Sequence, residues 1–264
     1  MDVFYNESTG PVILRRCRLL DEAGAVHAFT TRQGGFSRGY CEGFNMDVKR
    51  DEPPGSVRKN REMLGGLLGF DINALAVTNQ VHKDVIRTVR PEDMGPEGVP
   101  DYECDGLVTD IAGSAVMCFS ADCIPVLLWD PVRRAAAAVH SGWRGTAMGI
   151  AATAVRAMES RFGCSPGDIV AALGPGIGPC CFETHDDVPE RMAELGDFSR
   201  RFISPRGEKW SVDLKGIIAS TLENAGVKKI ASDSLCTCCE GGLFWSNRRD
   251  GNNRGNQAAV IALV

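Results

Sequence analysis

Residues 114–141, SAVMCFSADCIPVLLWDPVRRAAAAVHS, are the most informative part of this sequence for its architecture. The stretch contains two short apolar runs, 114–119 and 124–129, whose length is typical of buried strands. Asp130-Pro131 then indicates a turn, and the run 135–139 has the length of a third strand. We therefore expect three consecutive buried strands in the middle of the chain.

The segments on either side mix strands with helices. A helix is predicted over 56–69, with Ser56 as its N-cap and Gly69 as its stop, and another over 146–162, ending at Gly163. A third helix is predicted over 213–225, and the remaining strands over 26–30, 74–81, 84–90, 168–173, 227–231 and 257–263.

These elements follow no strict βαβ order, so the expected class is α+β: one globular domain, residues 1–264, with a mixed β-sheet flanked by helices. The Pro- and Gly-rich segment 91–101 is interpreted as a surface loop rather than a domain boundary, because predicted strands flank it.

The composition and charge of the chain indicate which partners and which compartment to expect. The chain has 264 residues, 44% of them hydrophobic, and a net charge of −5, so it has no general basic character for binding nucleic acid. The N-terminus lacks the pattern of a signal peptide, and every apolar run is too short to span a bilayer. We expect a cytoplasmic protein without a nucleic-acid or membrane partner. No heptad or exposed apolar helix face is evident, which favours a monomer.

Eleven cysteines are present, and for a cytoplasmic protein the expectation is reduced thiols without disulfides. The cysteines Cys180–Cys181 and Cys236-x-Cys238-Cys239 are candidates for a second metal site. We interpret their spacing as different from the C-x₂-C of the usual structural zinc knuckle, so a second metal site is disfavoured.

Three residues point to a metal site at strand ends. His82 and His140 each follow an apolar run, and Cys123 lies in the break between two predicted strands. Two imidazoles and one thiolate suit Zn²⁺, and three protein ligands with one open position are typical of catalytic zinc. From the residues alone, other roles stay open: Cys123 as a core residue, the histidines as structural groups, or Cys123 and His140 as a nucleophile–base pair.

Six motifs in order resemble one known family. They are NQVH (79–82), DGLVTD (105–110), SADCIPVLLWD (120–130), AVHSGWRGT (138–146), LGPGIGPCCFE (173–183) and FWSNRRDG (244–251). Through these motifs the chain resembles the YfiH-type family, which is also called the laccase-domain or multicopper polyphenol oxidase family. The resemblance runs from about Thr31 to the C-terminus. It implies a YfiH-like fold and the metal ligands His82, Cys123 and His140.

The family has been described in two ways, which imply different activities. The older description of the family is that of copper polyphenol oxidases. The newer one is that of zinc enzymes that phosphorolyse adenosine, inosine and methylthioadenosine and deaminate adenosine. Four histidines cannot hold the several copper ions of a laccase, so we favour zinc, with a nucleoside and phosphate as small-molecule partners. Zinc lowers the pKa of bound water to roughly 7, which suits attack on C6 of adenine.

Other residues are candidates beside these ligands. Asp122 and Glu183 could transfer protons, and Cys123 could be catalytic itself. Phosphate would suit arginine, whose planar guanidinium binds oxyanions through two hydrogen bonds. The arginine candidates are Arg61, Arg144, Arg248 and Arg249, of which Arg144 falls at the expected start of a helix. Trp143 could stack on a base, and Asn45 could reach a ribose. For each of them an exposed or structural role is the alternative.

Four functions of different classes therefore remain. They are a zinc enzyme of purine nucleosides, a copper oxidase of phenols, a cysteine hydrolase using Cys123 and His140, and a non-enzymatic metal- or partner-binding module. Metal analysis of protein purified without added metal would separate the first three, and an assay with adenosine and phosphate would separate the first from the fourth.

Overall fold

The three central apolar runs form strands in the computed structural model, which describes residues 2–50, 53–95 and 98–264. They are β7 (Ala115–Ser120), β8 (Ile124–Asp130) and β9 (Ala135–Ser141), and every residue in them is buried. The prediction of three buried strands is confirmed. A strand buried on both faces needs an apolar layer on each side.

Part of the apolar layer comes from two six-stranded sheets that pack against each other. The first has the order β1-β2-β3-β15-β7-β4 and the second the order β14-β10-β8-β9-β6-β5. The other strands of the first sheet are β1 (Phe4–Thr9), β2 (Val12–Cys17), β3 (Val26–Thr30), β4 (Leu75–Val77) and β15 (Gln257–Ala262). Those of the second are β5 (Ile86–Thr88), β6 (Gly106–Thr109), β10 (Val170–Leu173) and β14 (Lys229–Ser232). Both sheets contain parallel and antiparallel pairs.

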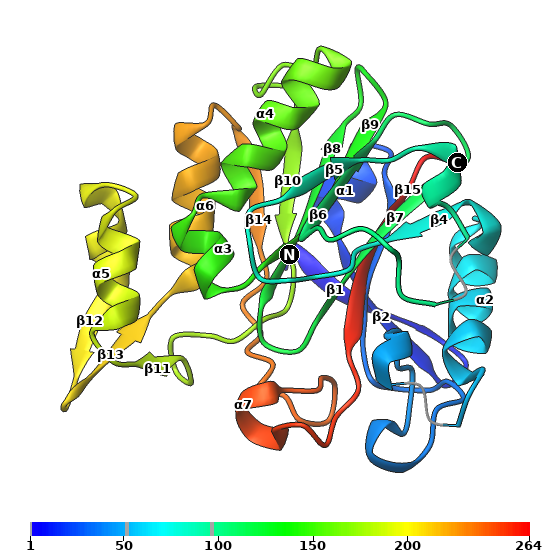
Figure 1. Ribbon diagram of the computed structural model, residues 1–264, viewed down its shortest axis with the longest axis horizontal. Helices are drawn as coiled ribbons and strands as arrows, with labels where there is room; N and C mark the ends of the chain where they lie inside the picture. The colour runs from blue at the N-terminus through cyan, green and yellow to red at the C-terminus, as the bar shows by residue number, and fades with distance from the viewer. Residues whose placement is uncertain (1, 51–52, 96–97) are drawn as a thin grey trace.

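The helices of the described residues lie around these two sheets and in the segments that connect their strands. They are α1 (Arg18–Glu22), α2 (Ser56–Leu68), α3 (Trp143–Ala147), α4 (Ile150–Phe162), α5 (Asp187–Ala193), α6 (Leu214–Asn224) and α7 (Asn247–Asp250). Short 3-10 helices are η1 (Gly39–Cys41), η2 (Val48–Arg50), η3 (Ile72–Ala74), η4 (Pro91–Asp93) and η5 (Asp197–Phe202). Figure 1 shows α4 and α6 on one side of the strands and α2 on the opposite side.

Alternate residues of β8 show how the layers pack. Leu127 and Trp129 belong to the cluster between the two sheets, together with Val116 and Ile261 of the first sheet. Val126 and Leu128 point the other way and pack in the cluster that contains α4 and α6. The first sheet packs its outer face on Leu64 and Leu68 of α2, among others. The four layers are therefore helix, sheet, sheet and helix.

The α+β class is confirmed, but the strands form two packed sheets rather than one mixed sheet. A further small sheet joins β11 (Glu183–Thr184), β13 (Lys209–Val212) and β12 (Ile203–Arg206), in that order. The reason is burial: fully apolar strands in succession cannot all be covered by the few helices that the chain provides. The two sheets cover one another, which removes most of that apolar surface from water.

Several predicted elements have different bounds in the structure. The helix 56–69 is present as α2, but the N-cap is Gly55 and Ser56 is its first residue. The predicted helix 146–162 is two helices, because Gly149 adopts φ +72° between α3 and α4. The strands 74–81 and 84–90 are reduced to β4 and β5, which belong to different sheets.

The N-terminal hairpin was not predicted. Four of the six residues of β1, FYNEST, are exposed, so the apolar alternation that identifies a strand is weak at this edge of the sheet. The predicted loop 91–101 begins with η4, and its residues 96 and 97 lie outside the described residues. Within the described ranges, no helix has the length and hydropathy needed to cross a bilayer.

The imidazole of His27, fully buried in β3, provides a test of the packing of the first sheet. Its Nε2 accepts a hydrogen bond from the backbone N–H of Cys17 at 2.9 Å, so the ring must be neutral to keep this bond. Burial and the nearby Arg16 lower the pKa of His27 to about 4 from its ordinary value of 6.5. Between pH 4 and pH 6.5, the imidazole of His27 is therefore protonated in the unfolded chain and neutral in the folded chain.

Protonation of His27 in the unfolded chain favours unfolding. We therefore expect the free energy of unfolding to be unaffected by this group above pH 6.5 and to decrease as the pH falls from 6.5 to 4. The loss amounts to about 3 kcal/mol of the free energy of unfolding. Urea unfolding at several pH values would measure it. The variant His27→Gln, which cannot take up the proton, should lack this part of the pH dependence. Parallel pH profiles for the two proteins would contradict the assignment.

Candidate functional site

The three candidate metal ligands meet where the ends of four strands come together. His82 follows β4, Cys123 lies between β7 and β8, and His140 is the penultimate residue of β9. Their ligand atoms all lie within 4.8 Å of one another. The rings of His82 and His140 stand nearly perpendicular, with centroids 4.9 Å apart. The expected convergence of these residues is therefore found.

The chain crosses from the first sheet to the second at Asp122, and this crossing presents Cys123. Asp122 adopts φ +98°, a conformation that side chains rarely adopt. Both of its carboxylate oxygens are engaged: Oδ1 accepts from Thr237 Oγ1 at 2.7 Å and Oδ2 from the backbone N–H of Arg248 at 2.6 Å. These bonds hold the turn. Asp122 lines the cavity, yet both oxygens already serve the structure.

Asp105, immediately before β6, orients both histidines. Its Oδ1 lies 2.9 Å from Nδ1 of His140, which leaves Nε2 of that ring for a metal. The same carboxylate accepts from the backbone N–H groups of Val81, His82 and Lys83 at 2.9–3.1 Å. This arrangement accounts for the left-handed backbone of His82, at φ +59°. One fully buried carboxylate therefore positions two of the three candidate ligands.

Gly142 allows the three side chains to approach one another. A Cβ atom at this position would lie 3.0 Å from Cys123 Sγ and 3.3 Å from Cδ2 of His82. Its φ of −72° is ordinary, so the requirement is for space rather than for backbone freedom. A side chain here would push into the ligand cluster.

Electrostatics favour the charged forms of Cys123 and His140. Burial opposes a thiolate, but the imidazole of His140, with help from His82, lowers the pKa of Cys123 to about 6. Burial likewise opposes an imidazolium, but Cys123 and Asp105 raise the pKa of His140 to about 9. Without a metal, the two groups form a thiolate–imidazolium pair near neutral pH. A cation can replace the shared proton, because metal binding requires a thiolate and a neutral imidazole.

A cavity of about 680 Å³ opens over this cluster. Apolar and aromatic side chains form part of its wall: Phe119, Trp143, Ile177, Phe182 and Leu214. Charged and polar side chains form the rest, including Asp47, Lys49, Arg50, Arg144, Asn247, Arg248, Arg254 and Asn256. A cavity of this size, with an apolar and aromatic part and several cationic side chains, suits a small molecule that has both a flat apolar part and an anionic part.

Arg144 has the most available positive charge in this wall. Its guanidinium lies over the ring of Trp143 at 4.3 Å and donates no hydrogen bond to any residue in the described ranges. By contrast, Arg248 donates to the carbonyl oxygens of Cys181 and Glu183. Ser120 Oγ, also in the wall, is buried without a hydrogen-bond partner among the described residues. Both Arg144 and Ser120 are therefore free to bind a ligand.

Four residues singled out in the sequence do not line the cavity. Asn45 is fully buried and bonds the backbone of Asp47, Arg50 and Asn256, so it organises the loop there. Arg61 is also buried and donates to the carbonyl of Met46.

The other two are Glu183 and Arg249, whose side chains also have partners within the protein. Glu183 forms an ion pair with Arg206, with Nε and Oε1 3.0 Å apart. Arg249 donates to the carbonyl oxygens of Thr237, Cys238 and Phe244, so its guanidinium clamps the loop that follows β14. The structure thus gives contacts with a structural role to all four residues.

Sequence reasoning did not single out Asp105, Gly142 or Gln80. The amide of Gln80 bonds both the N–H and the carbonyl of Phe119, which fixes the His82 loop to the end of β7. All three lie inside quoted motifs: Asp105 opens DGLVTD, Gly142 lies in AVHSGWRGT, and Gln80 in NQVH. Their position in these motifs, beside the candidate ligands, was the available signal.

The chain is similar in sequence to proteins of one known family. The model of a family described as multi-copper polyphenol oxidoreductase laccase matches residues 26–264. The chain is 35% identical to purine nucleoside phosphorylase YlmD of Geobacillus stearothermophilus, over 98% of this chain and 97% of that protein. It is 34% identical to human purine nucleoside phosphorylase LACC1, over 90% of this chain but only 55% of that longer protein.

A solved structure agrees in fold. The crystal structure of the YfiH protein of Bacillus licheniformis superposes with a TM-score of 0.92 at 30% identity, and the match covers all of both chains. The YfiH-like fold expected from the motifs is therefore confirmed.

Proposed function

The chain belongs to the multi-copper polyphenol oxidoreductase laccase family, and we propose that it is a zinc-dependent enzyme that phosphorolyses purine nucleosides and deaminates adenosine. The relatives named purine nucleoside phosphorylase support an enzyme that acts on nucleosides with phosphate. The observation that carries the proposal is the cavity itself. It places His82, Cys123 and His140 in the same wall as the available guanidinium of Arg144.

The three candidate ligands fit a single zinc ion. Two imidazoles and a thiolate are a suitable donor set, and Asp105 fixes the ring of His140 so that Nε2 is free. The other two histidines lie elsewhere: His27 is buried in β3, and His185 is not part of the cluster. One such site supports one zinc and not a group of coppers, which is why we propose zinc despite the name of the family.

When bound, zinc supplies a Lewis acid and an activated water, which are the chemistry that deamination at C6 of a purine requires. The protein residues bind and orient the substrate. Phe119, Trp143 and Phe182 offer faces on which a purine can stack, and Ser120 Oγ offers an unused hydrogen-bonding group. Ile177 and Leu214 add apolar surface to the cavity wall, against which the apolar part of the substrate can pack.

Phosphate is assigned to Arg144, supported by Arg50, Arg254 and Lys49 in the same wall. These side chains already have partners: Arg50 donates to Asn252, Lys49 to Asn79, and Arg254 to Asn247. The guanidinium of Arg144 keeps its hydrogen bonds for a ligand, and a planar guanidinium can bind two oxygens of a phosphate at once.

Arg144→Gln should weaken phosphate binding selectively. Loss of a charge-assisted hydrogen bond is expected to raise the KM for phosphate about 10- to 100-fold in phosphorolysis. Deamination of adenosine uses no phosphate and should fall by much less. Arg161→Gln, a change on the exposed end of α4 outside this cavity, should leave the KM for phosphate unchanged. An equal KM in wild type and Arg144→Gln would show that phosphate binds elsewhere.

Product analysis tests the proposed function as a whole. Pure protein is incubated with adenosine, with and without phosphate, and the products are separated. We expect adenine and ribose 1-phosphate only when phosphate is present, and inosine in both reactions. Absence of all three products from protein that contains zinc would contradict the proposal.

A cysteine hydrolase is the second candidate, because the thiolate–imidazolium pair of Cys123 and His140 is the arrangement of a nucleophile and its base. Metal content separates the two. Zinc near one equivalent in this cluster favours the nucleoside enzyme, and an active protein without metal favours the hydrolase. We further propose that residues 1–264 act as one catalytic domain, since the cluster between the two sheets joins residues from Phe4 to Leu263.

A further inference from the structure

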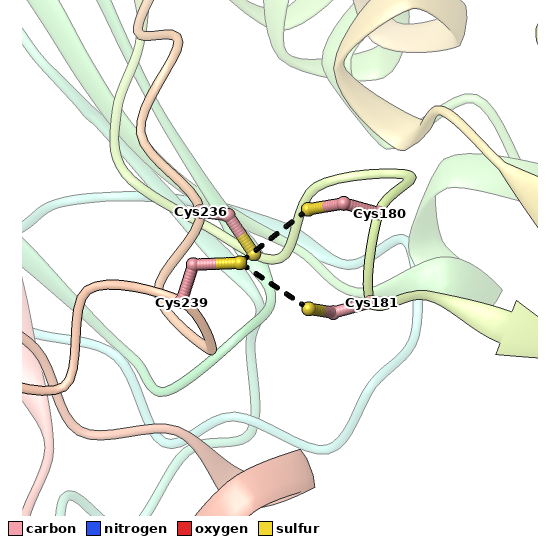
Figure 2. A group of neighbouring side chains, drawn as sticks. All are labelled: Cys180, Cys181, Cys236 and Cys239. Atoms are coloured by element: carbon pink, nitrogen blue, oxygen red, sulfur yellow. Dashed lines mark hydrogen bonds between the residues drawn. The ribbon is translucent and has the colours of Figure 1, made fainter.

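A second group of metal-binding side chains lies apart from the His82 cluster. Cys180 and Cys181 follow β10, and Cys236 and Cys239 follow β14, whose parallel pairing with β10 brings the two loops together. Figure 2 shows the four side chains from the two loops with their sulfur atoms facing one another. All four sulfur atoms lie within 4.8 Å of each other.

The spacing of the sulfur atoms suits one tetrahedral ion. Cys239 Sγ lies 3.6 Å from Cys180 Sγ and 3.5 Å from Cys181 Sγ. A zinc–sulfur bond of about 2.3 Å in a tetrahedral site places neighbouring sulfur atoms about 3.8 Å apart. The observed separations are close to this value, so four Zn–S bonds need only small movements of the side chains.

We propose that Cys180, Cys181, Cys236 and Cys239 bind a second zinc ion in a closed, structural site. Four thiolates leave no open position, which is the pattern of structural rather than catalytic zinc. Cys236 and Cys239 have the C-x₂-C spacing of many zinc sites, so the sequence-based interpretation that this spacing is missing was wrong. The other two ligands are adjacent in sequence.

The backbone around the thiols suits negatively charged sulfur. The N–H of Gly178 donates to Cys236 Sγ at 3.2 Å. A Cβ atom at Gly178 would lie 3.2 Å from Cys180 Sγ and 3.2 Å from the Cβ of Cys236, so the absence of a side chain lets the loop approach the sulfur atoms closely. An N–H group that faces sulfur stabilises the thiolate that a metal requires.

Positive charge surrounds the same loops. Arg206 donates to the carbonyl of Cys180 at 2.7 Å, Arg248 to that of Cys181 at 2.8 Å, and Arg249 to that of Cys238 at 3.0 Å. A zinc ion with four thiolates carries a net charge of −2. These guanidinium groups lower the electrostatic energy of such a site while they fix the backbone of the loops that hold it.

The second site would hold one wall of the catalytic cavity in place. Thr237, between two of the cysteines, donates to Asp122, which precedes the ligand Cys123. Arg248 and Phe182, in the cavity wall, lie beside the same two loops. Within the described residues, an isolated parallel bridge between Gly176 and Cys236 already joins the two loops. Zinc at this position would add a second link between them and would help to preserve the turn at Asp122. The proposal is independent of the reaction that the enzyme catalyses.

Zinc content measures the second site directly. Wild-type protein, the double variant Cys180→Ser/Cys239→Ser, and His82→Ala are saturated with Zn²⁺, dialysed, and analysed for metal and for protein. We expect about two zinc ions per chain in wild type and about one in each variant. Loading with Co²⁺ identifies the ligands, because four thiolates give stronger sulfur-to-metal charge transfer than one. The strong absorption of four thiolates should remain in His82→Ala and fall to the weaker absorption of one thiolate in the double variant.

Two matched controls separate the ligands from other thiols. Cys238→Ser removes a neighbouring thiol from the same loop, and Cys164→Ser removes a buried thiol outside both clusters. Both should keep two zinc ions. Circular dichroism of the double variant shows whether it is folded. If it is not, the single variant Cys180→Ser, with a weakened affinity measured by competition with a chelator, takes its place.

Three results would overturn the proposal. One is a single zinc per wild-type chain that disappears in His82→Ala, which leaves the cysteine group without metal. Another is an unchanged zinc content in the double variant. The third is titration of unreduced, denatured protein that finds nine free thiols rather than eleven, together with a disulfide mapped to Cys180 or Cys181 and Cys239. None of these three results would change the products expected from the assays with adenosine.

Discussion

The variant Cys123→Ala should lose the zinc held with His82 and His140 on dialysis, and its deamination of adenosine should fall to background. Only two imidazoles remain, and they bind zinc far more weakly than three ligands do. Water that is not activated has a pKa of about 15.7 and is a poor nucleophile at neutral pH. Phosphorolysis should also fall if the same ion orients the nucleoside. Zinc analysis and product analysis measure these two losses.

The fold should survive this change, because the cavity left by one thiol costs on the order of 1–2 kcal/mol if buried. Cys164→Ala, which removes a thiol away from both clusters, is the control and should keep zinc and activity. Activity alone does not distinguish a ligand from a nucleophile, since both roles need the thiol. A Cys123→Ala protein that keeps this zinc and loses activity would identify Cys123 as a nucleophile instead.

Asp105→Asn should weaken zinc binding at the same cluster about 10- to 100-fold, the usual effect of removing a hydrogen-bonding partner of a metal ligand. All four donors around this carboxylate are N–H groups: those of Val81, His82 and Lys83, and Nδ1 of His140. An amide puts its own NH₂ group against some of them. Each buried donor left without an acceptor costs about 1–3 kcal/mol, so the loop that carries His82 should loosen.

Competition with a chelator measures the affinity, and its pH dependence reports the state of His140. Asp105 raises the pKa of His140, so in the variant that ring should lose its proton at a lower pH and zinc binding should begin at a lower pH. Asp110→Asn, an exposed change in the same motif, should match wild type. Equal affinities for zinc in Asp105→Asn and wild type would show that this carboxylate does not support the ligands.

The local sequence was sufficient for most strands and for the choice of His82, Cys123 and His140. Uninterrupted apolar runs such as 124–129 can only be buried strands or helices, and their length and the breaks at 121–123 and 130–131 separate these cases. The three candidate ligands were selected because the motifs that contain them resemble those of a known family. Nothing in their spacing alone indicated a site, since they belong to loops far apart in the chain.

Strand β1 and the break between α3 and α4 were not predicted, for physical reasons. Strand β1 is largely exposed, so its residues carry little of the apolar pattern on which prediction depends. The break between α3 and α4 depends on one glycine with a positive φ, which a continuous helical pattern conceals.

Tertiary structure was needed wherever a role depends on which atoms remain free. By sequence, all four arginines were candidates for phosphate binding, with Arg144 and the pair Arg248–Arg249 preferred to Arg61. In the fold, Arg61 and Arg249 are used by backbone carbonyls, whereas Arg144 keeps its donors.

The same distinction explains Asp105 and the four cysteines. A carboxylate can orient two histidines, and two pairs of thiols can meet, only because parallel strands and packed sheets bring distant loops together. Residue type and apolar pattern are local properties, and a single sequence contains them. Hydrogen-bond partners and the distances between loops arise from packing, so they appear only when the chain is folded.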